Sequence, residues 1–309
     1  MRHQAISIRG LAVACGLLAS ASVAQAAPET RVSGTGTDAG NCPITAPCRT
    51  FAFAHTQTNN NGAINVLTSG NFGPLTITKP ISIVADGVEA VINTGAGGAA
   101  IIVQASGAAV VSLRGLTIDL RGTNNRGISF VSGGALRVQN CVIRKSDIGI
   151  FFEPASGTPE LHVADSVIAN AVTNGILVPP TGSAGVTATL IRVRVENTVQ
   201  EAAIEFSASA TTGAIMATVR DSVVTGNGQQ GIVVGGGTAS AMIHRSAFVN
   251  NTTAIVASGT GVIRMGDSTV TGNEFGFFPF IGGTIESYGT NKVDGNGADG
   301  APTSTIAMK

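Results

Sequence analysis

Hydrophobic residues recur along most of the chain in short alternating runs, and the runs come in sets of three. In the clearest set, Val111 and Leu113 form the first run, Leu116 and Ile118 the second, and a Gly-Ile pair ending at Ile128 opens the third. Alternation with a period of two indicates β-strands. Because no amphipathic helical pattern lies between the runs, each set predicts three short strands.

The second run of each set ends in an aliphatic anchor, and the anchors give the length of the repeat. They are Ile118, Ile143, Ile168, Val195, Val224, Val249, Val270 and Val293. Successive anchors are 21 to 29 residues apart, most often 25. A period of 20–50 residues indicates a solenoid, propeller or array, and a WD-type propeller needs about 40–45 residues per blade. The pattern therefore predicts an all-β, single-stranded right-handed parallel β-helix with about 25 residues per coil.

Asparagines recur in the turn that follows the second strand of successive coils. They are Asn170, Asn197, Asn227, Asn251, Asn273 and Asn296. Stacked coils bring equivalent residues within about 4.8 Å of one another, so that each amide can bond its neighbours above and below. Asparagine also tolerates left-handed backbone geometry at tight corners. We therefore predict a structural asparagine ladder at these positions rather than a ligand site.

The two ends of the chain differ from the repeat. Residues 1–26 combine Arg2 and Arg9 with a short apolar run and a small-residue site ending at Ala26, which is typical of a secretory signal peptide. The run is shorter than the roughly 20 residues of a spanning helix, although a membrane anchor is the alternative. We expect an exported protein, periplasmic or extracellular, whose mature chain has no membrane span. Residues 27–62 predict an N-terminal cap with a loop and a short helix, residues 63–294 the β-helix, and residues 295–309 a polar C-terminal tail.

Three cysteines follow the predicted signal peptide. Cys42 and Cys48 are six residues apart, and in an oxidising compartment this spacing favours a small disulfide loop. A zinc site is the alternative, but no histidine or second cysteine pair lies nearby in sequence. Cys141 falls on an inward row of small residues, so we expect a buried thiol.

Four segments resemble the pectin-lyase-like right-handed parallel β-helix superfamily. They are the Cys42–Cys48 loop running into residues 49–52, residues 74–79, residues 113–118 and the closing residues 296–306. More narrowly, the chain resembles uncharacterised secreted bacterial right-handed β-helix repeat proteins. The resemblance implies the fold and export, but a fold of this kind carries many activities and fixes none.

The motifs of the superfamily's known enzymes are missing from the chain. An Asn-Thr-Asp, an Asp-Asp pair, a Gly-His-Gly, an Arg-Ile-Lys and an Asp-Pro-His-Asp do not occur, and there is no tryptophan. No acidic cluster within one repeat suits calcium, and we expect no cofactor. Asp165, Asp221 and Asp267 recur at one position of the coil, which Asn140 and Ser246 are expected to share. A turn role explains them best, and a pair of catalytic carboxylates is the alternative.

Charge and composition narrow the possible partners. Basic and acidic residues number 18 each, charged residues make up 12% of the chain and aromatic residues 4%. So apolar a chain with so little charge is not disordered. Without a basic excess or stacking aromatics, we expect no nucleic-acid partner.

A set of basic side chains is predicted to point outward from the first strand of each coil. The set is Arg114, Arg137, His162, Arg220 and Arg264, with Arg245 uncertain by one position. The superfamily resemblance implies that this sheet lines a long groove, where guanidinium groups can bind carboxylates bidentately. The alternative is a solvated face on which the arginines pair with Asp165, Asp221 or Glu160.

The sequence therefore favours a secreted β-helix that is not an enzyme and that binds glycans or surfaces through this groove. An acidic polysaccharide or a cell-surface glycan is the expected partner. Two alternatives remain. One is a divergent lyase, hydrolase or epimerase acting on acidic polysaccharide, and the other is a purely structural or adhesive module.

Overall fold

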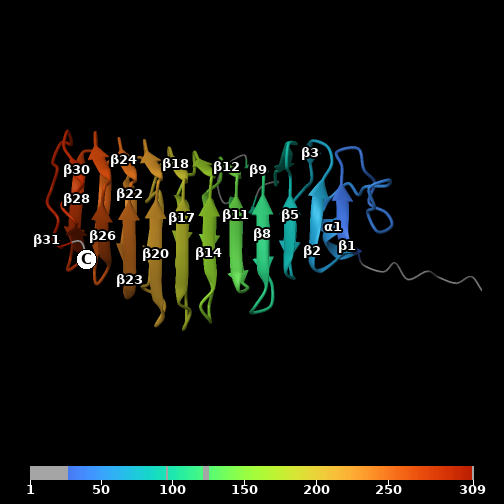
Figure 1. Ribbon diagram of the computed structural model, residues 1–309, viewed down its shortest axis with the longest axis horizontal. Helices are drawn as coiled ribbons and strands as arrows, with labels where there is room; N and C mark the ends of the chain where they lie inside the picture. Colours follow the sequence, from blue (N-terminus) through green and yellow to red (C-terminus); the bar gives the residue numbers. More distant parts are fainter. Residues whose placement is uncertain (1–26, 95–96, 121–124, 308–309) are drawn as a thin grey trace, which may run out of the picture.

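The computed structural model describes residues 27–94, 97–120 and 125–307, so the predicted signal peptide lies outside the described residues. Within these ranges the chain winds through three parallel sheets of twelve, nine and ten strands. Figure 1 shows the strands standing side by side along one long axis, from the blue N-terminal end to the red C-terminal end. Between residues 58 and 280 each coil contributes one strand to each sheet in turn, which confirms the predicted parallel β-helix.

All strands of the described residues belong to the three sheets. The twelve-stranded sheet consists of β1 (Ala27–Val32), β2 (Thr58–Val66), β5 (Ile81–Val84), β8 (Val110–Arg114), β11 (Ala135–Gln139), β14 (Glu160–Ala164), β17 (Val186–Ile191), β20 (Ala214–Arg220), β23 (Thr238–His244), β26 (Val262–Gly266), β29 (Thr284–Ser287) and β31 (Ser304–Thr305). The ten-stranded sheet consists of β3 (Gly70–Asn71), β6 (Ala90–Ile92), β9 (Leu116–Asp119), β12 (Val142–Arg144), β15 (Val167–Ala169), β18 (Arg194–Glu196), β21 (Val223–Thr225), β24 (Ala247–Val249), β27 (Thr269–Thr271) and β30 (Lys292–Val293). The nine-stranded sheet consists of β4 (Leu75–Ile77), β7 (Gly98–Gln104), β10 (Asn125–Ser132), β13 (Ile148–Phe152), β16 (Asn174–Val178), β19 (Ile204–Ser207), β22 (Gln230–Gly235), β25 (Thr253–Ser258) and β28 (Phe275–Phe280).

The aliphatic anchors stack in register along the ten-stranded sheet. Ile143 pairs with Ile118 on one side and with Ile168 on the other, and all three side chains are fully buried. Further along, the row contains Phe248 where the sequence predicted Val249. The expected position was wrong by one residue, because Ala247, Phe248 and Val249 are all apolar and their pattern fits two registers.

The Gly-Ile pair that opens each third strand has a steric origin. A Cβ atom on Gly127 would point into the core, 2.6 Å from Cγ2 of Ile143, and closer still to the carbonyl oxygen of Gly149. Such contacts exclude most side chains, since neighbouring coils are held only about 4.8 Å apart. Ala203 and Ala254 occupy the equivalent position in later coils, so a methyl group is the largest side chain found there in those coils.

Four asparagines form a ladder inside the turns of the last coils. The Nδ2 atom of Asn227 donates to Oδ1 of Asn251 at 2.7 Å, Asn251 donates to Asn273 at 3.0 Å, and Asn273 donates to Asn296 at 2.8 Å. Each Oδ1 also accepts the backbone N–H of the preceding asparagine, and Oδ1 of Asn227 accepts the backbone N–H of Thr198. The side chains therefore bond both the amide and the backbone of adjacent coils.

The prediction was wrong for Asn170 and Asn197, which lie one position earlier in the turn. They form a separate exposed pair, with Nδ2 of Asn197 3.3 Å from Oδ1 of Asn170. Both have positive φ, 55° and 57°, so they serve the left-handed corner rather than the ladder. The ladder position itself is taken by Ala171 and Thr198 in those coils.

A second ladder, which the sequence analysis did not anticipate, runs through buried serines at the corner before the ten-stranded sheet. Its members are Ser166, Ser222, Ser246 and Ser268. Each hydroxyl donates to the carbonyl two residues earlier and accepts a backbone N–H of the preceding coil. Ser246 is therefore the inward residue of its coil, and the neighbouring Ala247 is not.

Helix α1 (Phe51–Gln57) lies against the N-terminal end of the core. Its first turn is capped by Thr50, whose hydroxyl oxygen accepts the N–H of Phe53 at 3.2 Å. Phe51 is fully buried, with its ring centroid 4.9 Å from that of Phe72. The disulfide between Cys42 and Cys48, as predicted, closes the loop before the helix. Residues 59–62, expected as the end of the cap, belong to β2, which pairs with β1.

His55, in the last turn of α1, is 7% exposed and accepts a hydrogen bond from the N–H of Thr78 at Nε2, 3.3 Å away. Burial, with a smaller contribution from the charge of Lys79, lowers the pKa of His55 from 6.5 to about 4. Between pH 4 and pH 6.5 the histidine is protonated in the unfolded chain but neutral in the folded protein. The free energy of unfolding therefore falls as the pH falls through this range. We expect a loss of about 3 kcal/mol between roughly pH 7 and pH 4.5 in denaturant titrations.

The matched variant for this titration is His55→Gln, which removes the titrating group. Its free energy of unfolding is expected to change far less over the same pH range. Equal pH dependence in the variant and the parent protein would contradict the assignment to His55.

The C-terminal residues close the other end of the solenoid. Strand β31 pairs with β29, and the N–H groups of Gly276 and Phe277 donate to the carbonyls of Ala298 and Asp299. The polar tail is thus hydrogen-bonded to the last coil. No helix within the described ranges is long and apolar enough to cross a membrane.

Candidate functional site

The outer face of the twelve-stranded sheet carries the predicted basic residues, but in two rows rather than one. The middle row, in register from coil to coil, contains Ser112, Arg137, His162, Thr189, Thr218, Met242, Arg264 and Glu286. The end row contains Arg114, Gln139, Ala164, Ile191, Arg220, His244 and Gly266. Both rows are interrupted by uncharged residues, so the expected continuous stripe of guanidinium groups does not form.

Most of the predicted arginines have a carboxylate partner. Arg114 pairs with Asp86, Nε of Arg220 lies 3.2 Å from Asp221, and Nε of Arg264 lies 2.7 Å from Glu286. These pairs are half-exposed and neutralise one another's charge, which weakens the attraction of the sheet for a polyanion.

Arg137 differs from the other arginines of the set. It is exposed, and among the described residues no carboxylate oxygen lies within 4.0 Å of its guanidinium. Its register partner in the next coil is His162. Both side chains line a depression of about 630 Å³, which we call the central depression, together with Ser112, Gln139, Glu160, Leu161, Thr187 and Thr189. Its walls therefore offer a guanidinium that has no carboxylate partner within 4.0 Å among the described residues, together with hydroxyl and amide side chains and, further off, the carboxylate of Glu160.

A second depression of about 800 Å³, the C-terminal depression, lies on the same sheet near the end of the solenoid. Gly266 leaves a gap in the end row, with His244 and Tyr288 on either side. Arg264, Glu286 and Met242 of the middle row, with Asp267, Thr290, Ile306 and Ala307, complete the lining. The absence of a side chain at Gly266 gives room to the ring of Tyr288, because a Cβ atom there would lie 3.2 Å from Cδ2 of Tyr288.

Several ionisable groups meet in the C-terminal depression. Nδ1 of His244 lies 3.4 Å from Oδ2 of Asp267, and Arg264 pairs with Glu286. Tyr288 is the only tyrosine of the chain. The group includes side chains that can exchange a proton, His244 and Tyr288, and a guanidinium that can bind a carboxylate. The sequence analysis did not select His244 or Tyr288, and it considered Asp267 only as a turn residue or as one of a pair of catalytic carboxylates. The three residues come from consecutive coils, and only the register brings them together.

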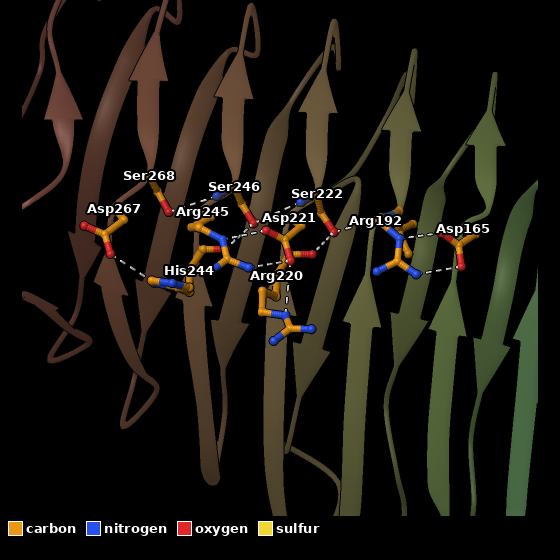
Figure 2. A network of polar contacts seen from close by, with 11 residues as sticks. Asp165, Arg192, Arg220, Asp221, Ser222, His244, Arg245, Ser246, Asp267 and Ser268 are labelled. Atoms are coloured by element: carbon orange, nitrogen blue, oxygen red, sulfur yellow. Dashed lines mark hydrogen bonds and ion pairs between the residues drawn. The ribbon is translucent and has the colours of Figure 1, made fainter.

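The predicted aspartates occupy the corner row, the left-handed residues between the first and second strands. Asn140, Asp165, Arg192, Asp221, Arg245 and Asp267 all have φ between 46° and 54°. Figure 2 shows how their charges alternate along the stack. Arg192 bonds Asp165 through two nitrogens at 2.5 and 2.8 Å, and Arg245 bonds Asp221 at 2.7 and 3.0 Å.

These contacts correct two expectations about the corner row. Arg245 lies at the corner, where Ser246 was expected, and does not point outward from the first strand. Hydrogen bonds from Arg192 and Arg245 hold the pKa values of Asp165 and Asp221 below their usual range, so both carboxylates stay ionised. Because Asp165 and Asp221 are each hydrogen-bonded to an arginine, the geometry favours the turn role over a catalytic pair.

Cys141 is 1% exposed, and burial raises the pKa of its thiol to about 11. A thiol with so high a pKa is not a nucleophile near neutral pH. In the described part of the chain, no group of three or more His, Cys, Asp or Glu side chains is arranged to hold a metal ion.

Comparison with solved structures identifies the fold. The pectate lyase Pel9A superposes with a TM-score of 0.50 at 13% identity, over 86% of this chain and 70% of that chain. The A-module of the mannuronan C-5 epimerase AlgE4 of Azotobacter vinelandii gives a TM-score of 0.35 at 14% identity, over 80% of this chain and 91% of that chain. No protein-family model and no curated protein sequence matches the chain. The protein therefore has the pectin-lyase-like right-handed parallel β-helix fold, and at these identities the likeness extends to the fold alone.

Proposed function

We propose that the protein binds acidic polysaccharide along the outer face of the twelve-stranded sheet, with the central depression as the main contact. The observation that carries the proposal is Arg137, an exposed guanidinium without a carboxylate partner among the described residues, beside His162 in that depression. The pectate lyase that has the same fold acts, by its name, on an acidic polysaccharide.

The chemistry of the central depression suits a uronate unit. A free guanidinium can form two parallel hydrogen bonds to one carboxylate, and such charge-assisted bonds are stronger than neutral ones. Thr187 and Thr189 provide hydroxyl groups that can bond the sugar hydroxyls. Arg114, Arg220 and Arg264 contribute less to binding, because each would first have to leave its own carboxylate.

The test is the double change Arg137→Ala and His162→Ala, assayed by calorimetry and by electrophoresis through gels that contain polygalacturonate. We expect the affinity to fall at least about tenfold, because a hydrogen bond to a charged group contributes about 1.5–3 kcal/mol. The affinity of the parent protein is expected to fall with added salt.

The matched control is Arg114→Ala, which removes an exposed arginine of the same sheet that is paired with Asp86. Its affinity is expected to stay within about twofold of the parent value. Equal losses in the control and the double variant would contradict a specific role for the central depression. If polygalacturonate does not bind the parent protein at all, the structural or adhesive alternative takes precedence.

A second candidate function is catalysis in the C-terminal depression on the same class of polymer. It is favoured by the grouping of His244, Tyr288 and Arg264 in one hollow. Once Arg264 leaves Glu286, its guanidinium can neutralise a uronate carboxylate and make the adjacent C–H more acidic, and a histidine or tyrosine can transfer the proton. Incubation with polygalacturonate and polymannuronate distinguishes the outcomes: unsaturated ends indicate elimination, new reducing ends hydrolysis, and inverted C5 protons in the NMR spectrum epimerisation.

Catalysis of this kind would require the proton-transferring side chains. His244→Ala or Tyr288→Phe should then abolish product while the protein remains folded. Absence of all three products in the parent protein would exclude this candidate for these two polymers.

We further propose that the protein is exported by the segment 1–26. The segment combines Arg2 and Arg9 with a short apolar run and a small-residue site ending at Ala26. Mass spectrometry of the protein recovered from the periplasm and the medium is expected to find an N-terminus at Ala27.

A further inference from the structure

Exposed phenylalanines are concentrated on a single strand at the end of the nine-stranded sheet. The chain has 12 phenylalanines. Those of the described residues that are highly exposed are Phe275, Phe278 and Phe280, at 38%, 41% and 47%, and all three belong to β28. We call them the aromatic platform. This is an uneven distribution for a protein that buries most of its other phenylalanines.

The platform rings lie side by side on the outer surface. The ring centroids of Phe275 and Phe278 are 6.2 Å apart with their planes tilted by 59°, and those of Phe278 and Phe280 are 5.9 Å apart with their planes 18° from parallel. Beyond this strand, the chain segment that bonds it consists of Ala298 and Asp299, which are followed by Gly300. Beside this segment the three rings keep 38% to 47% of their surface exposed.

A strained residue adjoins the platform. Ile281 follows Phe280, is 74% exposed and has φ 41°, a left-handed conformation that is unfavourable for a β-branched side chain. The register makes it equivalent to Gly236 and Gly259, which adopt the same conformation at no steric cost. The coil that contains β28 therefore has an exposed apolar side chain where two preceding coils have glycine. This arrangement costs backbone energy and places Ile281 beside three exposed rings.

The size of this surface argues against a second protein molecule as its occupant. A phenylalanine buries 150–250 Å² when covered, so the exposed fractions of the platform amount to roughly 250 Å² of ring surface. Even with Ile281 added, this is well below the roughly 800 Å² that each partner buries in a stable protein complex. The surface fits a smaller ligand with flat apolar faces.

We infer that the aromatic platform and Ile281 form a second glycan contact, which takes the apolar C–H faces of neutral or uncharged sugar units. Two of the rings lie nearly parallel, and stacking on a ring face needs no charge. The inference rests on the proposed polysaccharide-binding function and adds a contact of different chemistry. The turn after β28 leads directly into β29, whose Glu286 lines the C-terminal depression, so the platform is close in sequence to that depression.

The experiment uses polygalacturonate and fully methyl-esterified polygalacturonate, which share one backbone and differ in that each carboxylate is replaced by an uncharged methyl ester. We expect the parent protein to bind the ester with an affinity that salt does not change, since stacking involves no ion pair. Phe278→Ala with Phe280→Ala should weaken binding of the ester at least about tenfold. The control, Val131→Ala with Val199→Ala, removes two other exposed apolar side chains and should bind as the parent does.

Ile281→Gly gives an independent check, because its effects on stability and on binding have opposite signs. Relief of the left-handed isoleucine should raise the midpoint of denaturation, while binding of the ester weakens severalfold. A merely structural role for Ile281 predicts no loss of binding.

The outcomes separate this inference from the proposed function. If the phenylalanine variant binds the ester as the parent does, the inference about the aromatic platform is overturned. The proposed function is then tested separately, by the Arg137 experiment on polygalacturonate. If the parent protein sediments as a dimer that the same variant dissociates, the platform is a protein interface and the inference is also overturned. Loss of ester binding in the phenylalanine variant, with ester binding retained in the Arg137→Ala, His162→Ala variant, supports two distinct contacts.

Discussion

Replacing Asn251 with alanine is expected to lower the free energy of unfolding by about 3–5 kcal/mol. The Oδ1 atom of Asn251 accepts the backbone N–H and the Nδ2 group of Asn227, and its own Nδ2 donates to Asn273 and to the carbonyl of Val224. Removing the amide leaves several buried polar groups without a hydrogen-bond partner. Each such group costs roughly 1–3 kcal/mol of stability. Denaturant unfolding followed by circular dichroism measures the loss.

The matched control for the ladder is Asn197→Gly. This change also deletes an asparagine amide at a turn, but from the exposed pair, and glycine keeps the left-handed backbone unstrained. We expect a change below about 1 kcal/mol. Hydrogen exchange should show the damage of Asn251→Ala centred on the last coils, because a solenoid transmits stability mainly between neighbouring repeats. Similar losses in the two variants would contradict a special role for the buried ladder.

Gly149→Val is expected to cost about 3 kcal/mol or more, or to prevent folding. A Cβ atom at this position would lie 2.6 Å from Cγ2 of Ile168 and closer to the carbonyl oxygen of Gly175. The oxygen belongs to the backbone of the next coil, so relief requires the stacked strands to move apart. Thermal and denaturant unfolding provide the measurement.

Gly107→Ala is the counterpart of this change. Gly107 has no heavy atom within 4 Å of an added Cβ. We expect this variant to be neutral or stabilised by a few tenths of a kcal/mol, because alanine restricts the unfolded chain. If Gly149→Val were equally well tolerated, the steric explanation of the Gly-Ile pair would be wrong.

The coil architecture is predictable from the sequence because burial selects residues at a fixed period. Ile118, Ile143 and Ile168 are fully buried in one row, so their spacing records the length of a coil. The register becomes ambiguous where apolar residues are adjacent. At Ala247–Val249 two alignments satisfy the pattern, and only the packing of Phe248 into the core decides between them.

The asparagine rows show a similar limit. Two neighbouring positions of the turn both accept asparagine, one for its left-handed backbone and the other for its buried amide. Asn250 and Asn251 occupy both positions in a single coil. Sequence spacing alone does not separate the two physical roles, and Asn170 and Asn197 were assigned to the wrong one.

The candidate site was the least predictable part of the molecule. Whether an arginine is free or neutralised depends on side chains one coil away, such as Glu286 for Arg264. The C-terminal depression brings together His244, Gly266 and Tyr288, which come from three successive coils. A single sequence reveals which residues point outward, but the partners across coils follow only from the exact register.

The alternation of charge in the corner row determines which gains or losses of whole coils keep opposite charges next to each other. Deleting the one coil that carries Arg192 would bring Asp165 next to Asp221, with like charges at the spacing of adjacent strands. Deleting two consecutive coils would join Asp165 to Arg245 and preserve the order of signs. Gain or loss of repeats in this part of the chain is therefore electrostatically easier in pairs than singly.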